Sequence, residues 1–206
     1  MRVATHTLLS TAMLYPEHPS RLPFGMSPGK SPITSDGTAF VALLRAVAVG
    51  GTGKLPMTEL KAMAEALGYT GVRTYIASGN LIFRAAATEA KVKAALEARL
   101  AAYAGKPVGV VVRTAAEMAA ALAANPFKDA APNRTVAIFL DVAPPSDTLA
   151  KVSGGTVEEV RLGTREIYVH YGNGMADSKL KIQDARAGTA RNLNTVAKLA
   201  ELAAAL

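Results

Sequence analysis

The chain has 206 residues, of which 50% are hydrophobic, and this is enough to bury the core of a domain without a disulfide or a metal. It contains no cysteine, which excludes disulfide scaffolds, thiolate zinc sites and cysteine nucleophiles. The net charge of +7 favours anionic partners such as phosphates or nucleic acid, although a solvated basic surface would have the same composition.

Residues 1–37 are predicted to be a disordered or extraneous tail. The apolar run at residues 3–15 is interrupted by polar residues and is too short to cross a bilayer. The following stretch combines several prolines with serine and glycine, and such a composition cannot bury enough apolar surface to fix the backbone. We therefore expect no membrane partner and a cytoplasmic location.

Residues 38–113 are predicted to form a first ferredoxin-like half. Hydrophobic spacing and turn residues indicate a strand, a helix, a hairpin turning at Ser78-Gly79-Asn80, a second helix and a fourth strand. The expected segments are 40–45, 57–67, 72–76, 81–83, 92–103 and 108–112. Together they give the order βαββαβ.

Residues 114–206 are predicted to contain a linker helix and a second ferredoxin-like half. Thr114-x-x-Glu117 is typical of a capping box and opens the linker helix. The segments expected beyond it are a strand at 135–141, a short helix at 145–152, a hairpin of 157–162 and 166–171, and a helical C-terminal region. The order βαββα is close to a repeat of the first half, and we expect an α+β fold with both halves packed as one compact unit.

Several short motifs occur along residues 39–200. They are Phe40-Val-Ala-Leu-Leu-Arg45, Val49-Gly50-Gly51, Met57-x-x-Leu60, Val72-Arg-Thr-Tyr-Ile-Ala-Ser-Gly-Asn80, Asn125-Pro-Phe127, Ser178-Lys-Leu180 and Thr189-Ala-Arg-Asn-Leu-Asn-Thr195. They resemble the bacterial family catalogued as domain of unknown function 1697. The resemblance implies ferredoxin-like subdomains and no established activity. The chain departs from the family pattern at Ala46 and Ala48, where a glycine and an asparagine are expected.

A glycine-rich loop, Gly50-Gly51-Thr52-Gly53-Lys54, connects the first strand to the first helix. Its backbone N–H groups and Lys54 could hold an anion, or the loop could be a plain flexible connection. It is not a Walker A motif, because Ala48 and Leu55 occupy positions that require glycine and a hydroxyl residue.

The right-handed crossover predicts that the first two strands run parallel, so that the ends of both lie at one edge of the sheet. This would gather Arg45, Lys54, Ser78 and Asn80 around backbone amides as a ligand-binding cluster. The alternative is that Ser78 and Asn80 only stabilise a tight turn.

A second anion-sensitive site is predicted at the start of the terminal helix, where Asn192 or Asn194 would be the N-cap. Arg191 would add a bidentate donor beside it, with Lys179 and Lys181 a short way upstream. Alternatively, the asparagines serve only as caps and Arg191 pairs with a carboxylate such as Asp184.

Three functions are compatible with these features. The first is binding of a small anionic or phosphate-bearing ligand. One alternative is weak, sequence-independent binding of nucleic acid; the central strands lack the aromatic residues on which bases would stack, so stronger binding is not expected. The other alternative is a protein-interaction scaffold. The residue patterns predict no catalytic residues, no cofactor and no metal. They leave open whether the protein is an enzyme and what its oligomeric state is.

The composition of the tail gives a first testable prediction. Deletion of residues 1–36 should leave the free energy of unfolding of the remaining chain unchanged, because such a segment contributes no buried apolar surface. Chemical denaturation of both forms would measure this, and loss of cooperative unfolding after deletion would contradict it.

Overall fold

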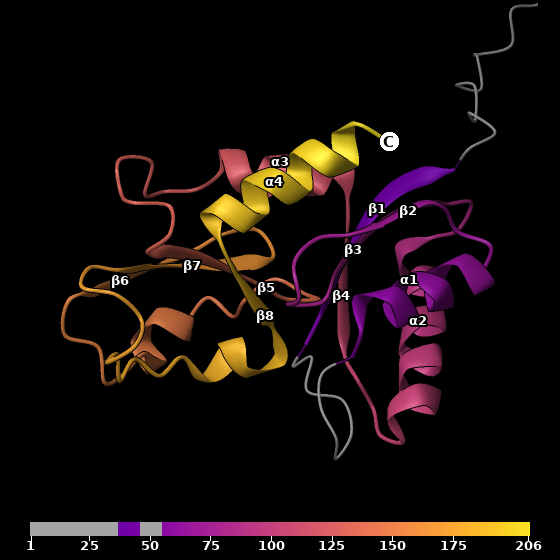
Figure 1. Ribbon diagram of the computed structural model, residues 1–206. Coiled ribbons are helices and arrows are strands. Elements are labelled where there is room, and N and C mark those ends of the chain that lie inside the picture. Colours follow the sequence, from indigo (N-terminus) through magenta and orange to yellow (C-terminus); the bar gives the residue numbers. More distant parts are fainter. Residues whose placement is uncertain (1–36, 46–54) are drawn as a thin grey trace, which may run out of the picture. The chain divides into compact units, whose positions relative to one another are not determined.

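The computed structural model describes residues 37–45 and 55–206. The elements of the first half are β1 (Thr38–Leu44), α1 (Met57–Ala66), β2 (Thr70–Thr74), β3 (Asn80–Ala85), α2 (Glu89–Ala104) and β4 (Val110–Thr114), and the linker helix α3 (Ala115–Ala123) follows. Those of the second half are β5 (Thr135–Phe139), the 3₁₀-helix η1 (Thr148–Lys151), β6 (Glu158–Leu162), β7 (Glu166–Tyr171), the 3₁₀-helix η2 (Gln183–Ala187), β8 (Thr189–Asn192) and α4 (Leu193–Ala204). The fold is therefore α+β (Figure 1).

The strands form two four-stranded antiparallel sheets with the same connectivity. Their orders are β2-β3-β1-β4 and β6-β7-β5-β8. The registers also correspond, because Leu43 pairs with Asn80 as Phe139 pairs with Glu166. We infer that the second half repeats the first, with η1 and η2 in the places of α1 and α2.

The second half differs from its predicted order at two points. The short helix expected at 145–152 is the four-residue 3₁₀-helix η1. The C-terminal region expected to be helical begins with η2 and contains a further strand, β8, before α4. The sequence of β8, Thr-Ala-Arg-Asn, lacks the apolar alternation of a strand, which explains why it was missed.

Three apolar clusters hold the described part of the chain together. One fills the space between the first sheet and helices α1 and α2, and contains Phe83 and Leu96. A central cluster combines residues of both sheets with α3 and α4, which pack against each other (Figure 1) and contribute Met118 and Leu199. A smaller third cluster, around Ile167, covers the other face of the second sheet. That face is thus covered by short elements alone.

Helices α3 and α4 begin in the same way, each directly after the last strand of its half. Thr114 accepts a hydrogen bond from the backbone N–H of Glu117 in a complete capping box, as its sequence predicts. Asn192 accepts one from the backbone N–H of Thr195 and is the N-cap of α4. No helix in the described ranges is both long enough and apolar enough to span a bilayer.

Candidate functional site

A buried arginine of the second half is bound by the first half. Arg191, on β8, is 8% exposed. Its Nε donates to Asn80 Oδ1 at 2.6 Å, and its Nη2 donates to the carbonyl oxygens of Ser78 at 2.9 Å and Leu44 at 3.1 Å. Its Nη1 donates to Thr189 Oγ1 and to the Ala190 carbonyl, each at 2.8 Å. We call this cluster the Arg191 bridge.

A buried arginine of the first half makes the reciprocal contact. Arg113, on β4, is 1% exposed. Its Nη2 donates to the carbonyl oxygens of Leu140 at 2.6 Å and Arg165 at 3.1 Å, and its Nε lies 3.3 Å from Glu166 Oε1. We call this cluster the Arg113 bridge. Each half thus inserts one arginine into the strand ends of the other.

The two bridges occupy equivalent positions in the repeat. Val41 pairs with Arg113 across the first sheet, and Ala137 pairs with Arg191 across the second. By the same register, Asn80 in the first half is equivalent to Glu166 in the second. The Arg113 bridge therefore contains a carboxylate at a position where the Arg191 bridge contains a neutral amide.

This difference leaves positive charge at the Arg191 bridge. Burial lowers the pKa of Arg191 to about 10, so the guanidinium is still charged near neutral pH. Among the described residues it forms no ion pair; its acceptors are carbonyl, amide and hydroxyl oxygens. A buried cation without a carboxylate partner is costly and attracts an anion.

The structure brings Arg191, Ser78 and Asn80 together, although they were predicted in two separate sites. Asn80 is fully buried rather than part of an exposed turn, and its Nδ2 donates to Ser78 Oγ and to the Tyr75 carbonyl, each at 2.9 Å. These polar groups are therefore occupied within the protein. The predicted ligand residues Gly50, Gly51 and Lys54 lie outside the described residues.

Asp184, the carboxylate named in the alternative interpretation of Arg191, is not among the hydrogen-bond partners of Arg191. Asp184 Oδ2 instead accepts a hydrogen bond from Thr148 Oγ1 at 2.8 Å and lies 3.8 Å from Lys151 Nζ. Asn194 is exposed in the first turn of α4. Among the predicted site residues, Lys179 has an exposed cationic side chain and lies upstream of β8.

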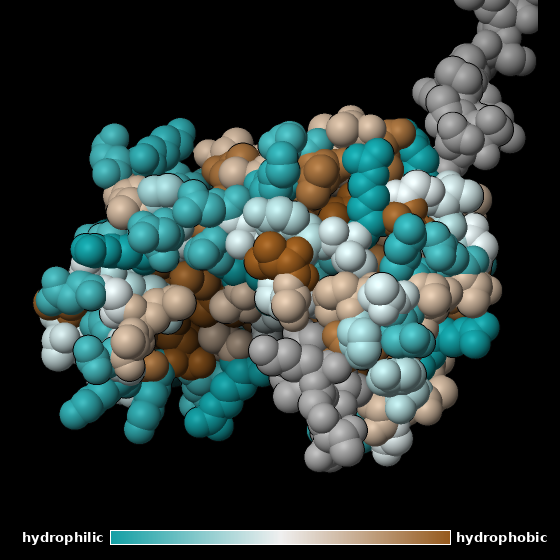
Figure 2. Space-filling model, in the orientation of Figure 1, coloured by the Kyte–Doolittle hydropathy of each residue, from teal (hydrophilic) through white to brown (hydrophobic). Residues whose placement is uncertain are grey.

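A hollow lies beside η2 on the face of the second sheet that carries the third apolar cluster. Its apolar part has a volume of about 260 Å³, and an adjoining polar part has about 360 Å³. The apolar part is lined by Ile138, Tyr171, Leu180, Ile182, Ala185 and Arg186. The polar part is lined by Lys151, Ser153, Leu180, Lys181, Ile182, Gln183 and Arg186. We call the two parts together the basic groove; Figure 2 shows hydrophobic side chains in a recess of this half, bordered by hydrophilic ones.

The segment that forms the wall of the groove is held at both ends. Glu158, on β6, accepts hydrogen bonds from Ser178 Oγ and from the backbone N–H of Thr156, and these bonds lower its pKa to about 2. Further along, Lys181 and Ser153 exchange two backbone hydrogen bonds of 2.8 and 3.1 Å. This bridge fixes an extended stretch in which Leu180 and Ile182 pack against the third apolar cluster.

The cations around the groove differ in their partners. Lys151 pairs with Asp147 at 2.9 Å and is therefore partly neutralised. Lys181 and Arg186 are exposed, and within the described residues neither forms an ion pair. Arg45 Nη2 donates to the Arg186 carbonyl at 2.7 Å, so this predicted ligand residue supports the groove rather than the Ser78 turn.

The sequence pointed to Lys181 only as a basic residue upstream of the terminal helix, together with Lys179, and it gave no indication of Arg186. The predicted residue Lys179 is exposed beside them but does not line the groove. One signal was present in the sequence: basic and apolar residues alternate from Lys179 to Ile182, as expected for an extended segment with one solvated face. Within the described residues no cluster of His, Asp and Glu could hold a metal ion.

Fold and site together define a duplicated α+β protein with reciprocal arginine bridges and a basic groove. The family model described as "Protein of unknown function (DUF1697)" matches residues 38–168, and the chain belongs to this family. No curated protein matches it. The chain is similar to a solved structure, a conserved bacterial protein from Streptococcus pneumoniae, with 24% identity, a TM-score of 0.66 and coverage of 81% of this chain and 98% of the other. This likeness supports the fold alone.

The charge difference between the bridges can be tested at Asn80. In the Arg113 bridge, Glu166 Oε2 also accepts from the backbone N–H of Arg165 at 3.1 Å, and Gly79 offers the equivalent N–H. Asn80→Glu should therefore be more stable than the isosteric control Asn80→Gln by about 1–2 kcal/mol at pH 7, because only the carboxylate compensates Arg191.

Denaturant unfolding of both variants across pH measures this difference. The carboxylate is stabilised in the folded state, so the advantage is present above the pKa of an unfolded glutamate, about 4.3, and is lost as the pH falls below it. Equal stability of the two variants at pH 7 would show that Arg191 has no uncompensated charge.

Proposed function

We propose that the protein binds a small anionic ligand with an apolar part, such as a phosphate or carboxylate ester of a ring compound, in the basic groove. The observation that carries the proposal is the pairing of an apolar floor with two cations, Lys181 and Arg186, that form no ion pair among the described residues. Most ligand sites combine a largely apolar lining with a few convergent polar groups, as here.

Each part of the groove has a distinct role in the proposed complex. The guanidinium of Arg186 can take two oxygens of a phosphate or carboxylate at once, whereas the ammonium of Lys181 acts as a point charge. Both parts of the groove are lined by Arg186, so the anionic group would lie at their junction. The apolar group would then contact Ile138 and Tyr171.

Arg191 does not line the groove. Its hydrogen bonds are directed to the protein, and it is 8% exposed, so we assign no ligand contact to it. η2 leads directly into β8, which places this buried charge in the same connected segment as Arg186.

We also propose that both halves are ferredoxin-like, as the sequence suggests. The support is the βαββαβ order of the first half and the antiparallel strand order β4-β1-β3-β2, repeated as β8-β5-β7-β6. The aromatic residues Phe40 and Phe83 are buried against α1 and α2. They are not accessible for base stacking, and this favours a small ligand over nucleic acid.

The proposal predicts which substitutions weaken binding. Lys181→Gln with Arg186→Gln should weaken the binding of phenyl phosphate at least tenfold, and the parent should bind phenyl phosphate more tightly than inorganic phosphate because of the apolar floor. Isothermal titration at fixed ionic strength measures both. The matched control is Arg99→Gln with Lys106→Gln, which removes the same charge from exposed positions outside the groove.

Two results would overturn the proposal. One is equal binding of phenyl phosphate by the parent and the groove variant. The other is an oligonucleotide that binds the parent tightly and is weakened equally by the groove variant and the control, since this would indicate a general charge effect rather than a site.

A further inference from the structure

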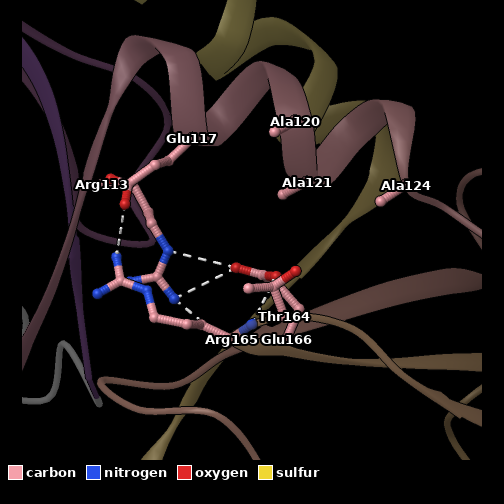
Figure 3. A pocket seen from close by; sticks show the side chains of 8 residues that line it. All are labelled: Arg113, Glu117, Ala120, Ala121, Ala124, Thr164, Arg165 and Glu166. Atoms are coloured by element: carbon pink, nitrogen blue, oxygen red, sulfur yellow. Dashed lines mark hydrogen bonds and ion pairs between the residues drawn. The ribbon is translucent and has the colours of Figure 1, made fainter.

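A second hollow, of about 170 Å³, lies beneath α3 next to the Arg113 bridge. Figure 3 shows its two sides: Ala120, Ala121 and Ala124 project from α3 on one, and Arg165 and Glu166 lie on the other. The remaining lining residues are Arg113, Glu117 and Thr164. The hollow is separate from the basic groove and shares no residue with it.

The repeat explains why this space exists. Thr114 and Asn192 are the equivalent N-caps of α3 and α4, so Ala121 and Ala124 are equivalent to Leu199 and Leu202. Leu199 is fully buried, and Leu202 packs against the central cluster. The hollow therefore lies where the other half places leucine side chains, and its volume is suited to apolar groups.

The charged side chains that line the hollow are two guanidinium groups and two carboxylates, which balance, in contrast to those of the basic groove. Arg113 pairs with Glu166 at 3.3 Å, and Arg165 pairs with Glu89 at 3.0 Å and with Glu117 at 3.1 Å. Among the described residues no buried side-chain nitrogen or oxygen lacks a hydrogen-bond partner. A charged ligand would therefore find no free counter-charge at this site.

Paired guanidinium groups still offer their faces to a flat ring. Hydrogen bonds to carboxylates run in the guanidinium plane, and the face is the part that stacks on aromatic rings. Arg113 already uses this property, because its guanidinium carbon lies 5.6 Å from the centroid of the Phe139 ring. A ring seated in the hollow would have the alanine wall of α3 on one side, Thr164 and Glu166 on the other, and the guanidinium groups of Arg113 and Arg165 beside it.

We propose that the hollow under α3 binds an uncharged planar ring of about the size of benzene, as the free molecule or as the ring of a larger ligand. The volume suits this occupant, because an apolar cavity of about 150 Å³ can hold benzene. The balanced charges select against ionised ligands, and the guanidinium faces select for a flat ring over a saturated one.

Benzyl alcohol is the probe for this site, with benzoate, benzylamine and cyclohexylmethanol as comparisons of similar size. Titration followed by amide chemical shifts should perturb residues 113–124 and 164–166, and benzyl alcohol should bind at least fivefold more tightly than each of the other three. Ala124→Leu, which introduces the side chain of the equivalent Leu202, should weaken binding at least tenfold.

The matched control is Ala119→Leu, an exposed position on α3 that does not line the hollow. It should bind benzyl alcohol like the parent. Ala120→Leu provides a second blocking variant if Ala124→Leu fails to unfold cooperatively. Equal binding by the blocking variants and the parent, preference for benzoate or benzylamine, or shifts confined to other residues would overturn the proposal.

Discussion

The exchange of arginines between the halves is the interaction on which the rest of the described structure depends. Arg113 and Arg191 are both buried, and each donates to the backbone carbonyls that end two strands of the opposite half. Buried carbonyl groups need hydrogen-bond partners. By supplying them, the two arginines fix the strand ends of one sheet relative to the other, while α3 and α4 fill the apolar space between.

The repeat also allows the charges of the two arginine bridges to be compared within one molecule. Two sites at equivalent positions of the repeat differ in whether they contain a carboxylate, because Glu166 in one corresponds to Asn80 in the other. The carboxylate neutralises one bridge, and a hollow with balanced charges lies beside it. The amide leaves the other bridge positive, and the segment leading to it carries Lys181 and Arg186. One α+β framework therefore presents two chemically distinct concave sites.

Much of the fold follows from the sequence, because the apolar alternation of the first half and the Thr114 capping box are local signals. The approach of Arg45, Ser78 and Asn80 to one end of the sheet follows from strand direction. The contact between Arg191 and Asn80 does not, since it joins residues 111 positions apart through polar atoms that carry no periodicity. The groove could not be predicted from the sequence either. Its wall consists of an extended segment, which Glu158 holds in place, and of the 3₁₀-helix η2, and neither has the periodicity of a longer helix or strand.

Double-mutant cycles on the two bridges test the central claim most directly. The cycles combine Arg191→Met with Asn80→Ala, and Arg113→Met with Glu166→Ala, and use the free energy of unfolding as the measurement. We predict coupling in both cycles of about 0.5–3 kcal/mol, with the larger value for the charged Arg113–Glu166 pair. Coupling close to zero in both would show that the two halves do not depend on the exchanged arginines.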